Sequence, residues 1–256
     1  MSENSTVVIN NNIVAIVQAR MASTRLPGKV LADIVGAPML ARVVTRAGRA
    51  NCLERIVVAT SDSSEDDEIV EICQTYGFEY FRGNELDVLD RFVQAARVFK
   101  AEVIVRITGD CPLIDPALID LTVETMQSAG ADFAANRLPW DRTFPVGLDV
   151  EVCTLEALEE AWQQAEMPNE REHVMPYLYK DGGKFEKILV RNDEDLSHFR
   201  WTVDEPSDLD LVREIYSSFG GRDDFTWREI LDLVKSKSTL AAINARVQQR
   251  GLEASN

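Results

Sequence analysis

Residues 13–29 read IVAIVQARMASTRLPGK, and this stretch decides the fold class. It begins with a β-branched apolar run, residues 13–17, which predicts a buried strand. The run ends abruptly in a polar, cation-rich loop. Apolar runs with the same polar ending recur at 54–60, 102–107 and 131–135, so we predict a strand in each.

Segments with helical spacing separate these strands, at residues 38–49, 64–76, 87–100 and 116–128; the first and last begin with proline. Alternation of strand and helix predicts an α/β fold with three layers, α/β/α, around a mostly parallel central sheet. The second half is less regular. There we predict strands near Val150 and at 185–190 and 199–203, helices at 155–164 and 172–179, and closing helices.

Composition predicts one cytoplasmic domain. The chain has 256 residues, of which 45% are hydrophobic, and we assign 13–250 to a single domain after a flexible, Asn-rich leader at 1–12. No apolar run reaches the roughly 18 residues of a membrane span. The net charge of −16 argues against nucleic acid or an anionic membrane as partner. The scattered cysteines and two histidines argue against structural zinc and disulfides.

The first loop concentrates positive charge in this acidic chain. Arg20, Arg25 and Lys29 lie within a dozen residues of each other, together with hydroxyl side chains and Gly28. Such a loop can bind phosphates in three ways. Arginine donates paired hydrogen bonds to phosphate oxygens, lysine adds a point charge, and glycine lets backbone amides come close to the ligand. It matches neither the Walker A pattern nor G-x-G-x-x-G. The alternative is a solvated basic loop paired with surface acids.

The loop Q-A-R-M-A-S-T-R-L-P-G-K resembles the signature of sugar cytidylyltransferases, especially those that activate ketodeoxyoctonate and acylneuraminate sugars or act in spore coat polysaccharide synthesis. The likeness runs from Ile13 to about Phe219. It implies the Rossmann-like, GT-A type fold of nucleotide-diphospho-sugar transferases, with CTP and a sugar acceptor as ligands, and suggests a homodimer. It implies phosphate contacts for Arg20, Ser23, Arg25 and Lys29, and nucleoside contacts for Gln18 and Ala19.

Two aspartates lie where predicted strands end. Asp110 follows the strand at 102–107, beside Gly109, and Asp204 follows 199–203 just before Pro206. One or two carboxylates with phosphate oxygens and water suffice for Mg²⁺. Asp110 could instead be a turn residue and Asp204 a helix cap. The resemblance favours the metal, because related enzymes use an Asp in a G-D-x-P loop and a late Asp before Pro.

Further residues are assigned with alternatives. Asp149 and Glu151 would face one side of a strand, where they could bind sugar hydroxyls or face water. Arg171 and His173 could bind an anionic sugar, or belong to an ordinary charged helix end. The nucleotide site is completed by Thr60, which could instead cap a helix, by Asp87, which could do the same, and by Arg106 on the strand that leads to Asp110.

The predicted reaction is in-line attack of a sugar oxygen on the α-phosphorus of the nucleotide, with pyrophosphate leaving. Catalysis then requires positioning and charge neutralisation, for which we select Arg20, Arg25, Lys29 and Asp110. A glycosyltransferase is the nearest alternative, although Gly109-Asp110-Cys111 lacks the Asp-x-Asp motif typical of that class. The other alternative is a non-catalytic nucleotide-binding protein.

Overall fold

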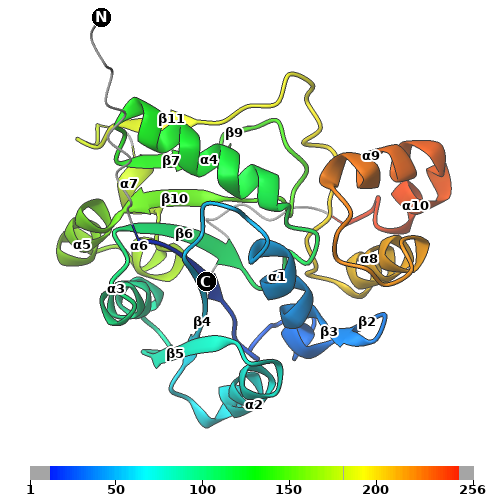
Figure 1. The fold of residues 1–256 in the computed structure, drawn as a ribbon, viewed down its shortest axis with the longest axis horizontal. Helices are drawn as coiled ribbons and strands as arrows, with labels where there is room; N and C mark the ends of the chain where they lie inside the picture. Colours follow the sequence, from blue (N-terminus) through cyan, green and yellow to red (C-terminus); the bar gives the residue numbers. More distant parts are fainter. Residues whose placement is uncertain (1–11, 181, 248–256) are drawn as a thin grey trace, which may run out of the picture.

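A central sheet of seven strands organises the computed structural model, which describes residues 12–180 and 182–247 (Figure 1). The strand order is β11-β7-β10-β6-β1-β4-β5. All pairs are parallel except those of β10 with β6 and β7, so the predicted mostly parallel sheet is confirmed. Its strands are β1 (Ile13–Gln18), β4 (Arg55–Ser61), β5 (Glu79–Gly83), β6 (Val103–Thr108), β7 (Phe133–Ala135), β10 (Glu151–Thr154) and β11 (Lys187–Leu189).

Helices cover both faces of the sheet, as the apolar residues of β1 show. Ala15 and Val17 pack into one hydrophobic cluster with α1, α2, α4, α8 and α9, whereas Val14 and Ile16 pack into another with α3, α5 and α7. Successive strand side chains point to opposite faces, so a continuous apolar run requires cover on both. The helices are α1 (Met39–Ala47), α2 (Asp67–Tyr76), α3 (Val88–Val98), α4 (Pro116–Ala129), α5 (Leu155–Gln164), α6 (Pro168–His173), α7 (Pro176–Tyr179), α8 (Pro206–Ser218), α9 (Trp227–Ser236) and α10 (Ser238–Ile243).

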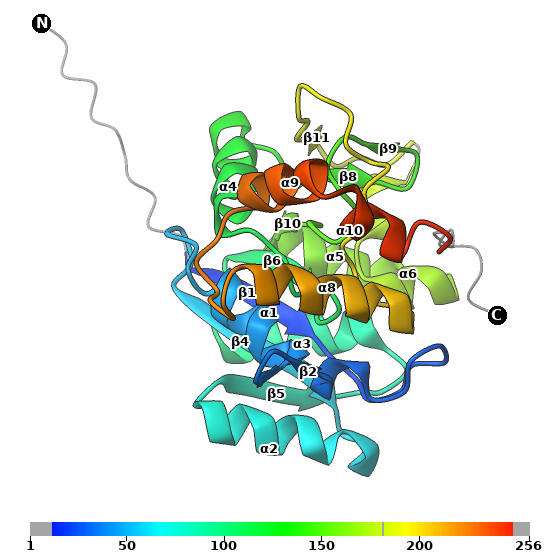
Figure 2. The same cartoon turned by 90° about the vertical axis from the view of Figure 1, so that its right-hand side faces the viewer.

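The last three helices lie beside α1 on the first face, and Figure 2 shows α8 and α9 in front of the sheet with α1. Short elements complete the fold: two hairpins, β2 (Asp33–Ile34) with β3 (Ala37–Pro38) and β8 (Arg137–Leu138) with β9 (Asp141–Arg142), and the 3₁₀ turns η1 (Lys29–Leu31) and η2 (Ser64–Asp66). Within the described ranges, no helix is long and apolar enough to cross a membrane. Nearly all of the predicted leader, residues 1–11, lies outside them.

Three secondary-structure predictions were wrong. The strand β5 was missed, because its sequence EYFRG is short and only partly apolar. The helix predicted at 172–179 is divided into α6 and α7 at Val174, which has a φ of 70°. Residues 199–203 form no ladder and make a single bridge, from Arg200 to Val146. The chain there runs against Gly147, where a Cβ would lie 2.4 Å from Thr202 N, so only glycine permits this approach.

Candidate active site

The loop after β1 begins where three neighbouring strands end. Gly109 N donates to Gln18 O at 2.9 Å, and Ala19 N donates to Ala59 O at 3.1 Å, so the ends of β6, β1 and β4 are tied together. A Cβ on Gly109 would lie 2.9 Å from Gln18 O, which explains the glycine. The loop therefore starts at the carboxyl edge of the sheet, where α/β proteins bind ligands.

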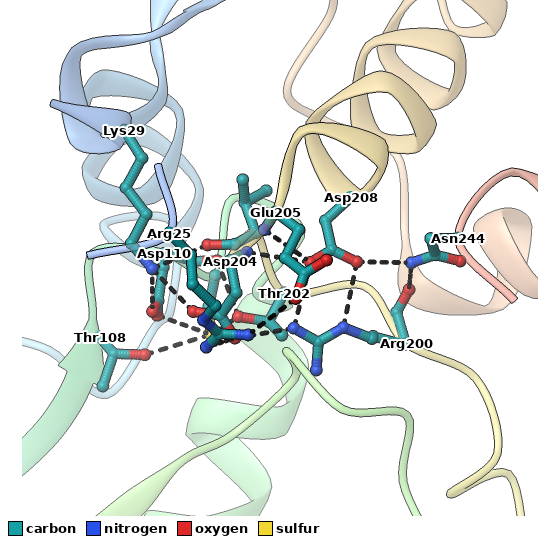
Figure 3. Close-up of polar contacts among 12 residues, drawn as sticks. Arg25, Lys29, Thr108, Asp110, Arg200, Thr202, Asp204, Glu205, Asp208 and Asn244 are labelled. Atoms are coloured by element: carbon teal, nitrogen blue, oxygen red, sulfur yellow. Dashed lines mark hydrogen bonds and ion pairs between the residues drawn. The ribbon is translucent and has the colours of Figure 1, made fainter. Parts of the chain in front are cut away.

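Lys29 lies between the two predicted metal ligands (Figure 3). Its Nζ donates to Asp110 Oδ2 at 2.9 Å, to Asp204 Oδ1 at 2.9 Å and to Val203 O at 2.8 Å. Burial opposes its charge, but the two carboxylates outweigh burial and raise the pKa of Lys29. The predicted convergence of the aspartates is confirmed, with an ammonium held between them.

Asp110 and Asp204 meet because two distant loops are joined. Val203 N donates to Asp110 O at 2.9 Å, and Thr202 Oγ1 donates to the same oxygen at 3.1 Å. Asp204 does not cap α8, because Glu205 is the N-cap residue. Asp110 lies in a turn, but its side chain binds Lys29, so the turn does not account for the carboxylate.

Arginines surround Asp204 as well. Arg25 Nη2 lies 3.1 Å from it, and Arg200, which sequence reasoning missed, donates to it at 2.7 Å and to Asp208 at 3.0 Å. Burial opposes ionisation of Asp204, but the charges and hydrogen bonds of Lys29, Arg200 and Arg25 lower its pKa to about 2. Asp204 is thus a carboxylate at neutral pH, as a metal ligand must be.

The carboxylates of Asp110 and Asp204 could supply part of the ligand set of a magnesium ion. Both carboxylates point at one cation already, the Lys29 ammonium. Among the residues that the structure describes, no group of three or more His, Cys, Asp or Glu side chains is placed to hold a metal. Mg²⁺ tolerates few protein ligands when phosphate oxygens and water supply the rest. The arrangement therefore suits a metal that is bound together with a phosphate ligand.

The other loop cations also have acidic neighbours. Arg20 Nη2 lies 3.7 Å from Glu172, and both side chains are well exposed, so this pair is weak. Arg25 is 3.5 Å from Glu205 in addition to Asp204. The alternative of a basic loop paired with acids thus describes these contacts, but Lys29 and Arg25 pair with the candidate metal site itself rather than with scattered surface acids. Ser23 lies in the same loop, partly buried.

A second charged cluster lies behind Gln18. Arg106 is buried, donates to Gln18 Oε1 at 3.0 Å and pairs with buried Glu151, so its polar groups are directed to protein partners. Asp149 accepts from Arg142 Nη2 at 2.8 Å, and Glu151 lies 3.7 Å from Arg137. The alternative that both face water is wrong for Glu151, which is buried, and arginines pair with both carboxylates; their binding of sugar hydroxyls stays a prediction.

Acidification tests the Asp149 ion pair. Burial disfavours its charged form, but the hydrogen bonds and charge of Arg142, with the charge of Arg137, outweigh burial and lower the pKa of Asp149. A depressed folded-state pKa gives stability that is present above the unfolded value, about 4, and is lost as the pH falls below it.

We expect the urea midpoint of the wild-type protein to fall between about pH 5 and about pH 3 more steeply than that of Asp149→Asn. Asp141→Asn is the matched control, because Asp141 is also ion-paired but its partner, Arg191, is exposed. Equal slopes for wild type and Asp149→Asn would contradict this account.

Arg171 and Asp87 bind each other. Arg171 Nε donates to Asp87 Oδ2 at 3.0 Å, and its Nη1 donates to the Trp162 carbonyl. Asp87 also caps α3, accepting from Asp90 N at 2.9 Å, as the helix-cap alternative predicted. The structure therefore gives Arg171 and Asp87 a role in joining α3, α5 and α6, and it does not bring them to Lys29.

His173 and Thr60 have contrasting surroundings. His173 Nε2 is buried and has no hydrogen-bond partner among the described residues; burial, with Arg106 and Arg137 nearby, lowers its pKa. Thr60 is fully buried, and its hydroxyl donates to Asp66 at 3.0 Å, so it is not positioned to touch a nucleotide base. Cys111 is buried as well, and burial raises its pKa, which disfavours the thiolate that a nucleophile needs.

Comparison with known proteins agrees with this geometry. A family described as cytidylyltransferase matches residues 14–218. The chain is 36% identical over 240 residues to an uncharacterized protein of Methanocaldococcus jannaschii, covering 93% of this chain and 96% of that protein. It is 31% identical over 239 residues to the spore coat polysaccharide biosynthesis protein SpsF of Bacillus subtilis, covering 88% and 94%.

A solved structure of a cytidylyltransferase from Leptospira borgpetersenii superposes with a TM-score of 0.86 at 31% identity, over 94% of this chain and all of that one. The family match, over residues 14–218, includes the loop after β1, the Asp110 loop and the Asp204 loop. The superposition also confirms the predicted nucleotidyltransferase fold. The chain belongs to the cytidylyltransferase family.

Proposed function

We propose that this enzyme transfers CMP from CTP to a sugar in polysaccharide or surface-glycan biosynthesis, with Mg²⁺ as cofactor and pyrophosphate as second product. The observation that carries this proposal is the convergence of Lys29, Asp110 and Asp204 at the carboxyl edge of the sheet. The family supports cytidylyl transfer, and its spore coat relative supports a glycan pathway. A homodimer and a cytoplasmic location stay predictions.

The site residues would have different roles in the proposed reaction, according to their side-chain chemistry. Mg²⁺ bound to Asp110 and Asp204 would supply Lewis-acid stabilisation of the transferring phosphoryl group. Arg20 and Arg25 place guanidinium groups along the loop, suited to phosphate oxygens, and Lys29 adds a point charge. Together these groups neutralise the charge that builds up as pyrophosphate leaves, and no covalent intermediate with the protein is required.

The two alternative functions have less support. Many glycosyltransferases use an Asp-x-Asp motif, but Thr108 and Pro112 stand at the two positions where a second Asp would accompany Asp110. Three cations in one loop also suit a triphosphate better than the diphosphate of a nucleotide sugar. A non-catalytic nucleotide-binding protein would have no need of the partly buried, ionised Asp204 beside Asp110. We therefore favour transfer from a triphosphate.

Thermal unfolding with each nucleoside triphosphate, with and without Mg²⁺, tests this function without knowledge of the sugar. We expect CTP with Mg²⁺ to stabilise the protein selectively, by about 2.7 kcal/mol at a hundredfold excess over the dissociation constant. CTP without Mg²⁺ should stabilise less. Selectivity for another triphosphate would contradict the base assignment, and no shift with any triphosphate would contradict the proposed function.

A further inference from the structure

Asp66 is a buried carboxylate that the predicted site does not include. It ends η2, between β4 and α2, and is 3% exposed. Asp66 stands in a run of alternating charges at 64–71, and such a run is typical of a solvated helix face. That interpretation is wrong for Asp66, whose side chain points inward to the end of β4 and to the loop after β1.

Hydrogen bonds from two separate segments meet on this one side chain. Oδ1 accepts from Met21 N at 2.7 Å. Oδ2 accepts from Thr60 Oγ1 at 3.0 Å, from Ser61 N at 3.1 Å and from Ser61 Oγ at 2.6 Å. Only an ionised carboxylate offers acceptors to all of these donors and no competing donor of its own. Burial opposes the charge, but these hydrogen bonds lower the pKa of Asp66 below its usual value.

The bond to Met21 reaches the functional loop near its start. Met21 follows Arg20 directly, and its carbonyl accepts from Gly28 N at 3.1 Å. Gly28 precedes Lys29 and adopts a left-handed φ of 68°, so this backbone bond closes the loop on itself. A single residue, Met21, is thus bonded to Asp66 through its N–H and to Gly28 through its carbonyl, and it joins the start of the loop to its end.

We propose that Asp66 is a positioning residue of the nucleotide site, which fixes the loop after β1 in the shape that presents Arg20, Arg25 and Lys29 to a triphosphate. This inference rests on the proposed function. Asp66 acts through the Met21 backbone and touches no substrate. Through the rigid strand β4, Thr60 and Ser61 hold the carboxylate in place, because both are fully or almost fully buried.

The test is nucleotide affinity in Asp66→Asn, measured by calorimetry with CTP and Mg²⁺. Asparagine keeps one acceptor oxygen, but its N–H₂ group faces either Met21 N or the Thr60 and Ser61 donors. The charge-assisted hydrogen bond to the donors that face this group is lost. We expect the dissociation constant to rise on the order of ten- to a hundredfold. Wild-type protein that fails to bind CTP would overturn the proposed function, whereas wild-type affinity in Asp66→Asn would overturn only the role of Asp66.

Asp120→Asn is the matched control, because Asp120 also anchors a distant loop. Its carboxylate accepts from Cys52 N at 2.9 Å and from Asn51 Nδ2 at 2.9 Å, before β4 begins and so at the opposite end of the sheet. A merely structural role for Asp66 predicts that both variants lose thermal stability and keep their CTP affinity. Positioning predicts that only Asp66→Asn loses affinity.

Asp66→Glu provides the same test if the asparagine variant does not fold. Glutamate keeps the charge and both acceptor oxygens, but one added methylene displaces them from Met21. We expect CTP to bind more weakly than to wild type, and a circular dichroism spectrum like that of wild type. Unchanged CTP affinity in a folded Asp66→Glu protein would overturn the proposal.

Discussion

Asp110→Asn should abolish CMP transfer while the protein stays folded. The substitution removes a negative charge from the pair that the proposed mechanism places beside the transferring phosphoryl group. Losses on the order of a hundred- to a thousandfold follow the removal of a single preorganised stabilising group, and loss of a metal ligand should cost at least as much. The fold should survive because the asparagine oxygen can still accept from Lys29 Nζ.

Pyrophosphate release with an accepted sugar measures this effect directly. Before the sugar is known, the Mg²⁺-dependent part of the CTP thermal shift should vanish in the variant. Asp210→Asn, which removes the same charge from an exposed position on α8, should behave as wild type in both assays. Undiminished pyrophosphate release from Asp110→Asn would remove Asp110 from the mechanism.

Lys29→Met should change metal and nucleotide affinity in opposite directions. In the nucleotide-free protein, the ammonium uses its hydrogen-bond donors on Asp110, Asp204 and Val203 O, so it competes for the place of a divalent cation. Methionine fills similar space without the charge. We expect the nucleotide-free variant to bind Mn²⁺ at least roughly ten times as tightly as wild type. This factor corresponds to the free energy of one charge-assisted hydrogen bond.

The same substitution removes a cation that the proposed mechanism assigns to the triphosphate, so CTP affinity should fall on the order of ten- to a hundredfold. Electron paramagnetic resonance of Mn²⁺ and calorimetry with CTP measure the two effects separately. Lys187→Met, at the far edge of the sheet on β11, is the control for loss of a lysine. Equal Mn²⁺ affinity in wild type and Lys29→Met would contradict competition.

Local patterns in the sequence were enough to predict the architecture. The apolar runs that end in polar loops, with helical spacing between them, predicted β1, β4, β6 and β7 and the helices α1 to α4 within a few residues. Strand and helix periods depend on neighbouring residues, so a single sequence reveals them. Asp110 and Asp204 were found because each comes soon after a segment that local pattern predicted as a strand, although the structure has a strand only before Asp110.

Ionic pairing was decided only by the tertiary structure. Arg171 binds Asp87 across 84 residues, and Arg106 binds Glu151 across 45, so residues predicted to meet ligands instead meet each other. Asp66 looked like a surface acid because charge alternation does not reveal a donor 45 residues away.

The sequence by itself thus determined most strands of the sheet, the cation-rich loop and the aspartates Asp110 and Asp204, since all three follow from local order along the chain. The tertiary structure decided that Lys29 lies between those aspartates, 81 and 175 residues away, and that Asp66 anchors the loop. A buried charge needs a partner, and tertiary contacts determine which residue that is. The spacing of residues along the sequence does not reveal the partner.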